Sequence, residues 1–280
     1  MNTQRTHYVT ATDGVTIGGT VHGQGRPLVF LHGGIGDGDV DWDRLLGHLT
    51  GWFTCYLPSM RGRGLSGDHP DVSPGRQVDD VLTYVDSIGG PTGLVGWSAG
   101  ANLALGAAAR SDAVDAVALL EPPMRSLMDE QEQAVIGDAV ARMGKLAAEG
   151  DLTAAVRAFA GGPFNDEEIA AAENAGYFEA TSRYVMHLLN LLPQVMAYEG
   201  PTAEDPAVLN AISARVLVLY GSDTLPFYQA GARHVAVHVP DARVREVPGA
   251  GHAAPLTHPE AIAKALTEFF VPSGDLTRRE

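Results

Sequence analysis

A serine inside a Gly-x-Ser-x-Gly pentapeptide is the residue of this sequence best suited to covalent chemistry. Ser98 lies in the pentapeptide of residues 96–100, directly after the apolar stretch 93–95 and directly before the small-residue run 101–110. A sharp strand-to-helix turn projects a serine hydroxyl above the sheet, and the flanking glycines let strand and helix pass closely. The pattern predicts a nucleophile elbow with Ser98 as nucleophile. A turn built only for packing would use the same small residues.

A glycine-rich loop follows the apolar stretch 28–31 and has the composition of an oxyanion-binding loop. The tetrahedral intermediate of acyl transfer carries an oxyanion, which needs backbone N–H donors from a loop that can approach closely. Gly34 supplies one candidate N–H, and Ala99, the residue after the predicted nucleophile, supplies the other. His32 is a further candidate for catalysis or substrate binding, although a histidine before such a loop more often bonds to backbone.

Charged residues follow two other predicted strands. Glu121 comes directly after the apolar stretch 114–120, and open α/β sheets bind ligands at the carboxyl ends of their strands. We therefore treat Glu121 as a site candidate, with capping of nearby backbone as an equal alternative. Arg61 and Arg63 lie in the loop 59–67, where we expect a structural turn with surface arginines; anion binding is the alternative.

A central sheet must position these residues. Apolar stretches that alternate with helical patterns predict a fold of the α/β class. The Asp-Gly pair at positions 13 and 14 predicts a hairpin at the start of the chain. The expected strands are 8–11, 15–17, 28–31, 53–57, 93–95, 114–120, 215–220 and 242–247. The expected helices of this part are 41–49, 77–88, 101–110, 227–239 and 259–270, followed by a frayed tail at 272–280.

Between residues 124 and 212 the strand signal disappears and helical patterns replace it, at 126–149, 152–159, from 165, and at 177–198. We therefore expect a core domain formed by 1–123 and 213–280, with 124–212 inserted as a helical cap. The residues expected to roof an apolar pocket are Phe164, Tyr177, Phe178, Met186, Leu188, Leu189, Leu192 and Met196, each of which suits internal packing equally well. His32, Gly33, Ile35 and Trp97 are expected to contact substrate from the core side.

The charge balance argues against some classes of partner. The chain of 280 residues has 34 acidic and 19 basic residues, a net charge of −15, and no basic stretch of the kind that nucleic acids or anionic membranes require. We expect a small-molecule substrate instead. Residues 1–6 are polar and no apolar run reaches transmembrane length, so we expect a cytoplasmic protein. The oligomeric state is left open, a homodimer included.

Cysteine and histidine usage predicts no disulfide and no bound metal. Cys55 is the single cysteine, so no intrachain disulfide can form, and we expect a buried thiol. His234 and His238 are four residues apart, but no carboxylate or cysteine joins them to complete a metal site. We therefore expect no metal and no other cofactor.

The order of these motifs resembles that of the α/β-hydrolase family over essentially the whole chain. The shared features are the HGG loop, the RGRG loop, GWSAG, a helical insertion, a strand ending in GSD, and a late GH. The resemblance implies an α/β-hydrolase fold, a mostly parallel central sheet flanked by helices with an inserted helical cap. It also implies Ser98 as nucleophile, His252 as general base, and Gly34 with Ala99 as the oxyanion hole. Serine at position 98 argues against the family's epoxide hydrolases and dehalogenases, which use aspartate there.

The acid of the triad is where this sequence departs from the family's commonest pattern. The usual acid follows the strand after the cap, three residues beyond a glycine, and Thr224 occupies that position. Asp223 lies one residue earlier. Some members, including lactonases that hydrolyse zearalenone, instead place a glutamate after the strand before the cap, and Glu121 is similar in position. The resemblance therefore implies two candidates, with a slight preference for Glu121.

The resemblance implies a serine hydrolase that cleaves a carboxylic ester or lactone of a mainly hydrophobic molecule through an acyl-enzyme. The same triad would also serve a carbon–carbon bond hydrolase or a cofactor-free perhydrolase. A non-catalytic small-molecule receptor is the alternative from another class, because some family members have that role.

Overall fold

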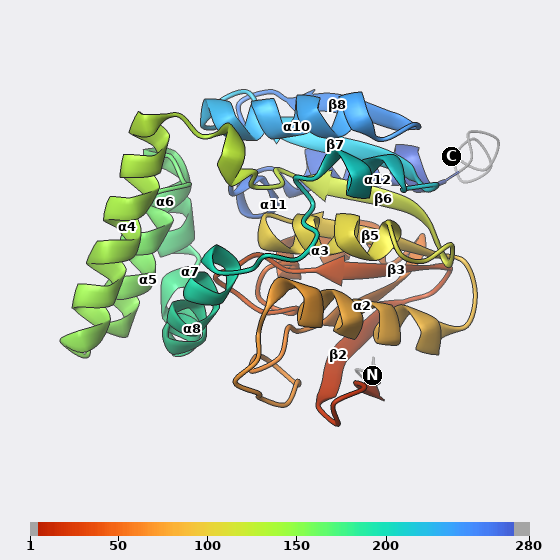
Figure 1. The fold of residues 1–280 in the computed structure, drawn as a ribbon, viewed down its shortest axis with the longest axis horizontal. Coiled ribbons are helices and arrows are strands. Elements are labelled where there is room, and N and C mark those ends of the chain that lie inside the picture. The colour runs from red at the N-terminus through yellow and green to blue at the C-terminus, as the bar shows by residue number, and fades with distance from the viewer. Residues whose placement is uncertain (1–4, 272–280) are drawn as a thin grey trace.

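A mostly parallel sheet forms the centre of the computed structural model, which describes residues 5–271 (Figure 1). The expectations for residues 1–4 and for a frayed tail at 272–280 lie outside these residues. Within them the sheet has eight strands in the order β1-β2-β4-β3-β5-β6-β7-β8. The strands are β1 (Arg5–Thr10), β2 (Thr16–Gly23), β3 (Arg26–Leu31), β4 (Phe53–Pro58), β5 (Thr92–Trp97), β6 (Val114–Leu120), β7 (Arg215–Gly221) and β8 (Ala242–Val247).

Only β2 runs against the direction of the other strands. The predicted Asp-Gly hairpin is present: Gly14 has a φ of 88°, and Thr10 pairs with Thr16 across the turn. β2 also pairs antiparallel with β4, and every later pairing is parallel. β5 is buried along its whole length, as expected of a parallel strand covered on both faces.

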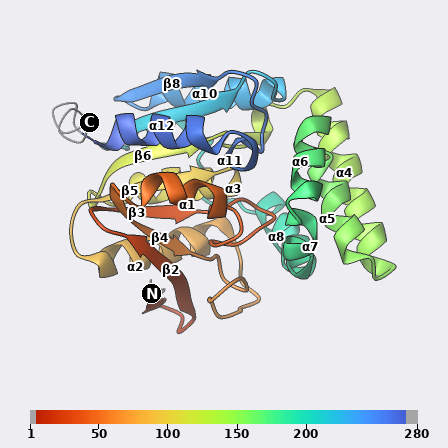
Figure 2. The same cartoon turned by 180° about the vertical axis from the view of Figure 1, so that it is seen from behind.

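Helices cover both faces of the sheet, and two hydrophobic clusters fill the space between. Figure 1 shows α2, α3 and α10 in front of the sheet, and Figure 2 shows α1 and α12 on the opposite face. The helices of this part are α1 (Asp43–Leu49), α2 (Pro74–Ile88), α3 (Ala99–Ala108), α9 (Pro206–Asn210), α10 (Pro226–His238), α11 (Ala254–Thr257) and α12 (Pro259–Phe270). The expected α/β-hydrolase architecture is therefore confirmed.

The chain between β6 and β7 contains no strand, and its part before α9 forms a helical group beside one end of the sheet (Figures 1 and 2). Its members are the short 3₁₀ turn Arg125–Leu127, α4 (Glu130–Ala148), α5 (Leu152–Ala160), α6 (Asp166–Asn174), α7 (Tyr177–Thr181), a second 3₁₀ turn Ser182–Tyr184, and α8 (Val185–Met196). The expectation of one helix over 177–198 is wrong, because the second 3₁₀ turn divides it. Arg183 and Tyr184 of that turn bond to Asp37 of the core, so a tertiary contact shapes the break.

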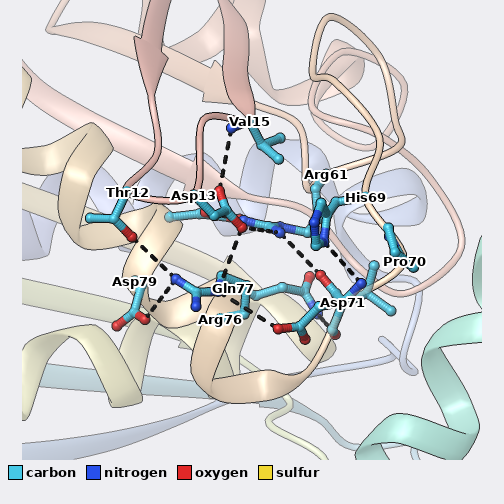
Figure 3. Close-up of polar contacts among 12 residues, drawn as sticks. Thr12, Asp13, Val15, Arg61, His69, Pro70, Asp71, Arg76, Gln77 and Asp79 are labelled. Carbon is cyan, nitrogen blue, oxygen red and sulfur yellow. Dashed lines mark hydrogen bonds and ion pairs between the residues drawn. The ribbon is translucent and has the colours of Figure 1, made fainter.

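Arg61 and Arg63 are each only 2% exposed, which corrects the expectation of surface arginines. Arg61 donates two hydrogen bonds of 2.7 Å to Asp80 of α2, and one of 2.9 Å to Asp13 in the first hairpin. Figure 3 shows this cluster, in which Asp71 also contributes its backbone carbonyl. The hydrogen bond from Arg61 lowers the pKa of Asp13 to about 2. The charge of Arg61 is therefore balanced by carboxylates, and its side chain links the first hairpin to α2.

Between Arg5 and Val271, no helix is long and apolar enough to cross a membrane. Cys55 is free and fully buried, in agreement with the expected core thiol.

Candidate active site

Ser98 occupies the strained turn between β5 and α3 that the pentapeptide predicts. Its φ of 53° and ψ of −120° lie outside the regions that non-glycine residues favour, at a cost of about 1–3 kcal/mol. Neighbouring residues must be small: a Cβ on Gly100 would lie 2.1 Å from the Leu31 carbonyl oxygen. The Ser98 N–H donates to the Leu120 carbonyl at 2.9 Å, which fixes the turn to the end of β6.

Glu121 is the next residue along β6, and it is the other non-glycine residue with positive φ (50°) in the described chain. Glu121 is buried, and both oxygens of its carboxylate have hydrogen-bond partners. Oε1 accepts the Gly221 N–H at 2.8 Å, while Oε2 accepts the Thr224 hydroxyl at 2.9 Å and lies 2.7 Å from Nδ1 of His252. Glu121 therefore lies directly against the predicted base.

Asp223 does not reach the imidazole. It is exposed, and its carboxylate accepts the hydroxyl of the adjacent Ser222 at 2.8 Å. Thr224, at the family's usual acid position, donates its hydroxyl to Glu121 instead. Of the two candidate acids, the structure brings only Glu121 to His252, because the end of β6 is closer to the imidazole than the outward-facing turn after β7.

His252 lies in the loop between β8 and α11 and is 3% exposed. Its carbonyl accepts the indole N–H of Trp97 at 2.8 Å, which links the histidine loop to the residue before Ser98. Because a carboxylate only accepts hydrogen bonds, the contact with Glu121 assigns the proton of neutral His252 to Nδ1. Nε2 is then the basic nitrogen, as a general base for Ser98 requires.

Gly34 and Ala99 lie close together, as an oxyanion hole demands. A Cβ placed on Gly34 would be 3.9 Å from the Cβ of Ala99. Within the described chain neither N–H has a hydrogen-bond partner, Ala99 because it is the first residue of α3. The Gly33 N–H, by contrast, donates to Asp41 at 2.8 Å. Gly34 and Ala99 therefore offer two free N–H donors that lie near each other.

Asp41 bonds to the loop that carries Gly34. The sequence predicted that a helix begins at Asp41, but the helix begins at Asp43. One oxygen of the fully buried Asp41 carboxylate accepts the Gly33 N–H, and the other accepts the Tyr177 hydroxyl at 2.9 Å. Burial raises the pKa of Asp41 to about 7. Tyr177 belongs to α7, so a residue of the helical group supports the loop that carries Gly34.

Three of the predicted pocket residues form a row of rings from β5 into the helical group. Trp97 stacks on Phe164 with centroids 6.3 Å apart, and Phe164 lies 6.5 Å from Tyr177 and 6.1 Å from the ring of His252. Leu188 of α8 has its Cδ1 3.9 Å from the position of a Cβ on Gly34. These apolar side chains gather beside the candidate oxyanion hole. Ile35 is buried in the same hydrophobic cluster.

Three predicted substrate contacts are corrected by their surroundings. His32 is completely buried, and its ring bonds to the Gly33 carbonyl at 2.8 Å and to the Met60 N–H at 2.9 Å. Burial lowers the pKa of His32 to about 3, which keeps it neutral for these backbone bonds. Met186 is 60% exposed on the outer side of α8, and Leu189 packs near Gly144 of α4 inside the helical group.

Two further residues contact the histidine loop and were missed as site residues. Tyr228 of α10 stacks on His252 with centroids 4.2 Å apart. Glu168, the N3 residue of α6, accepts the Ala253 N–H at 2.6 Å while completing a capping box with Asn165. The Asn-x-x-Glu spacing identifies the capping box in the sequence, but no local pattern indicates what either side chain touches across the fold.

The described residues contain no group of three or more His, Cys, Asp or Glu side chains arranged to hold a metal ion. His234 and His238 bond to backbone carbonyls instead.

Comparison with known proteins adds independent information. Residues 28–265 match the model of the alpha/beta hydrolase family. Over 254 residues, 88% of this chain and 94% of the relative, the sequence is 29% identical to a pimeloyl-(acyl-carrier protein) methyl ester esterase of Chromobacterium violaceum. An alpha/beta hydrolase structure from Sphaerobacter thermophilus shares 28% identity with a TM-score of 0.74, covering 95% of this chain and 100% of that one. A thermophilic esterase of Thermogutta terrifontis shares the fold, at 23% identity and a TM-score of 0.70, over 94% and 97% of the two chains.

Proposed function

This chain belongs to the alpha/beta hydrolase family, and on that premise we propose that it is a serine hydrolase of carboxylic esters or lactones. One observation carries the proposal: Nδ1 of His252 lies 2.7 Å from Oε2 of Glu121, and the carbonyl of His252 bonds to Trp97, the residue before a serine on a strained strand-to-helix turn. The esterase relative from Chromobacterium violaceum supports ester hydrolysis in general.

The mechanism follows from the roles of these groups. His252 Nε2 takes the hydroxyl proton as Ser98 attacks the carbonyl carbon, and Glu121 stabilises the resulting imidazolium. The Gly34 and Ala99 N–H groups bind the oxyanion. Collapse of the intermediate breaks the carbon–oxygen bond, and the imidazolium proton passes to the leaving-group oxygen. Water, deprotonated by His252, then hydrolyses the acyl-enzyme.

The substrate class is a mainly hydrophobic molecule, including lactones. Support comes from the apolar side chains of Phe164 and Leu188, which lie near His252 and Gly34 respectively. We assign residues 124–212 the role of a cap over the site, since helices α6, α7 and α8 of this segment contribute Glu168, Tyr177 and Leu188 to its surroundings. Glu121, placed after the strand before the cap, agrees with the position used by the lactonases this chain resembles.

Labelling with a fluorophosphonate, read by intact mass, tests the proposal. Wild type should gain one label, Ser98→Ala none, and Glu121→Gln should label far more slowly, while Asp223→Asn labels like wild type. Folded wild-type protein that takes no label would contradict the proposal. A panel of esters and lactones then tests the substrate class, which fails if short charged substrates are preferred.

A further inference from the structure

A buried phenol lies against the catalytic imidazole. Tyr228 is on the first turn of α10 and is 3% exposed. Its ring is nearly parallel to that of His252, at an interplanar angle of 19° and a centroid distance of 4.2 Å. Its hydroxyl oxygen lies 3.4 Å from His252 Nε2, the nitrogen that exchanges protons with Ser98 and the substrate.

This contact is a stacking contact rather than a good hydrogen bond. O–H hydrogen bonds are usually 2.5–3.0 Å long, and an imidazole nitrogen bonds in the plane of its ring. Because the two rings are nearly parallel, the Tyr228 hydroxyl approaches His252 Nε2 from outside the plane of the imidazole. The Tyr228 hydroxyl has no other hydrogen-bond partner within residues 5–271.

The phenol of Tyr228 remains protonated under working conditions. Burial raises its pKa well above 10, and the nearby negative charges of Glu121 and Glu168 act in the same direction. The group is therefore a hydrogen-bond donor at neutral pH, close to the proton-transferring nitrogen and without a good acceptor.

We propose that the Tyr228 hydroxyl donates a hydrogen bond to the leaving-group oxygen of the ester or lactone, an inference that rests on the hydrolase function proposed above. The leaving oxygen must come within about 2.6–3.2 Å of His252 Nε2 to receive its proton. The Tyr228 hydroxyl is 3.4 Å from the same nitrogen and approaches it from outside the ring plane, so a leaving oxygen that meets Nε2 on that side of the plane is a neighbour of the hydroxyl. As the carbon–oxygen bond breaks, the oxygen gains negative charge, the Nε2 proton moves to it, and Tyr228 keeps its own proton while stabilising the charge.

The role makes the contribution of Tyr228 dependent on the leaving group. An alkoxide, whether a simple alcohol or the opened end of a lactone, is a poor leaving group that needs this stabilisation. A 4-nitrophenolate is stable without it. Loss of the hydroxyl therefore affects alkyl esters selectively.

Ethyl hexanoate and 4-nitrophenyl hexanoate share one acyl group and are the probes for this test. Tyr228→Phe keeps the stacked ring and removes only the hydroxyl. We expect kcat/KM to fall about tenfold or more for the ethyl ester and less than about twofold for the nitrophenyl ester. Tyr220→Phe is the matched control, because that hydroxyl bonds to Glu246 on the exposed edge of the sheet, and it should change neither value.

The ratio of the two rates in one sample is independent of the fraction of active protein, so partial misfolding does not obscure the result. An equal loss on both esters would overturn the proposal in favour of a packing role, and no loss would overturn it as well. If wild type hydrolyses neither ester and takes no fluorophosphonate label, the hydrolase function itself fails. If wild type hydrolyses both esters and Tyr228→Phe leaves the ratio of the two kcat/KM values unchanged, only the role of Tyr228 is contradicted.

Discussion

His252 Nδ1 and Glu121 Oε2 lie 2.7 Å apart although 131 positions separate the two residues in the chain. Both side chains are 3% exposed, so the pair is shielded from water. The carboxylate reaches the imidazole from the end of β6, the neighbour of the nucleophile strand, and it is steadied there by Gly221 and Thr224.

The Glu121–His252 pair predicts which acid mutant loses activity. Glutamine at position 121 would present an amide N–H₂ to Nδ1 and favour the tautomer with the proton on Nε2, which cannot accept from Ser98. We expect kcat to fall by about 10³–10⁴ in Glu121→Gln. Asp223→Asn, the matched control on an exposed turn, should stay within about twofold. Steady-state kinetics on an activated ester measure both, and the opposite ranking would contradict the assignment.

The buried carboxylate of Glu168 predicts a pH dependence of stability. Burial raises its pKa from 4.5 to about 7, so the folded protein binds a proton that the unfolded chain has already released between these values. Its contribution to the free energy of unfolding is therefore fully present below about pH 4.5 and is lost as the pH rises through 7. Relative to Glu168→Gln, wild type should lose about 1–3 kcal/mol between pH 5 and pH 8, measured by urea unfolding.

Glu132→Gln is the control for this experiment. Glu132 is the N3 residue of the α4 capping box, and its carboxylate also accepts a core N–H, that of Phe227 at 2.9 Å. The Glu132 variant measures the general effect of removing a capping-box carboxylate that is bonded to the core. A flat difference between wild type and Glu168→Gln across the pH range would refute the prediction.

The bridge from Tyr177 through Asp41 to Gly33 predicts that a cap hydroxyl supports catalysis. Tyr177→Phe removes the donor to one oxygen of a fully buried carboxylate, and an unsatisfied buried group costs about 1–3 kcal/mol. We expect a lower free energy of unfolding by that amount. We also expect a several-fold fall in kcat, because the loop carrying Gly34 loses support. Tyr8→Phe, on a half-exposed ring of β1, should leave both quantities unchanged; unaltered kcat in Tyr177→Phe would reject the coupling.

The Arg61 cluster in Figure 3 predicts a stability effect far from the catalytic groups. Arg61→Met leaves the carboxylates of Asp80 and Asp13 without their buried cation, and breaking such a pair costs about 3–5 kcal/mol. Arg76→Met is the control. The partly exposed Arg76 makes ion pairs of 3.5–3.8 Å and a hydrogen bond to the Thr12 hydroxyl, so its loss should cost less than about 1 kcal/mol. Equal midpoints of urea unfolding for the two variants would disprove the prediction.

Several features of the site could be predicted because their cause is local. The strained turn at Ser98 follows from small residues between an apolar strand and a helix, and the glycines of the loop around Gly34 mark a close backbone approach. The capping box of Asn165 and Glu168 is likewise a property of four consecutive residues. Short-range sterics and hydrogen bonding determine such features, so the order of residues is sufficient to find them.

Other features depend on distances between remote segments. Arg61 and Arg63 were expected at the surface, because charge alone predicts exposure, yet carboxylates and carbonyls from other segments compensate their burial. The packing of α8 against the rest of the protein determines which of its residues face solvent. Met186 is therefore exposed, while Leu188 faces the loop that carries Gly34.

The sequence by itself determined the α/β class and the strand-to-helix turn at Ser98, since each leaves a pattern within a few residues. Its resemblance to a known family supplied the histidine candidate and the shortlist of two acids. Only the tertiary structure placed Glu121 rather than Asp223 against His252, and only it brought Tyr228 to His252 and Glu168 to Ala253. The physical reason is that a hydrogen bond requires atoms within about 3 Å. Strand register and helix packing set that separation, and no single stretch of sequence contains it.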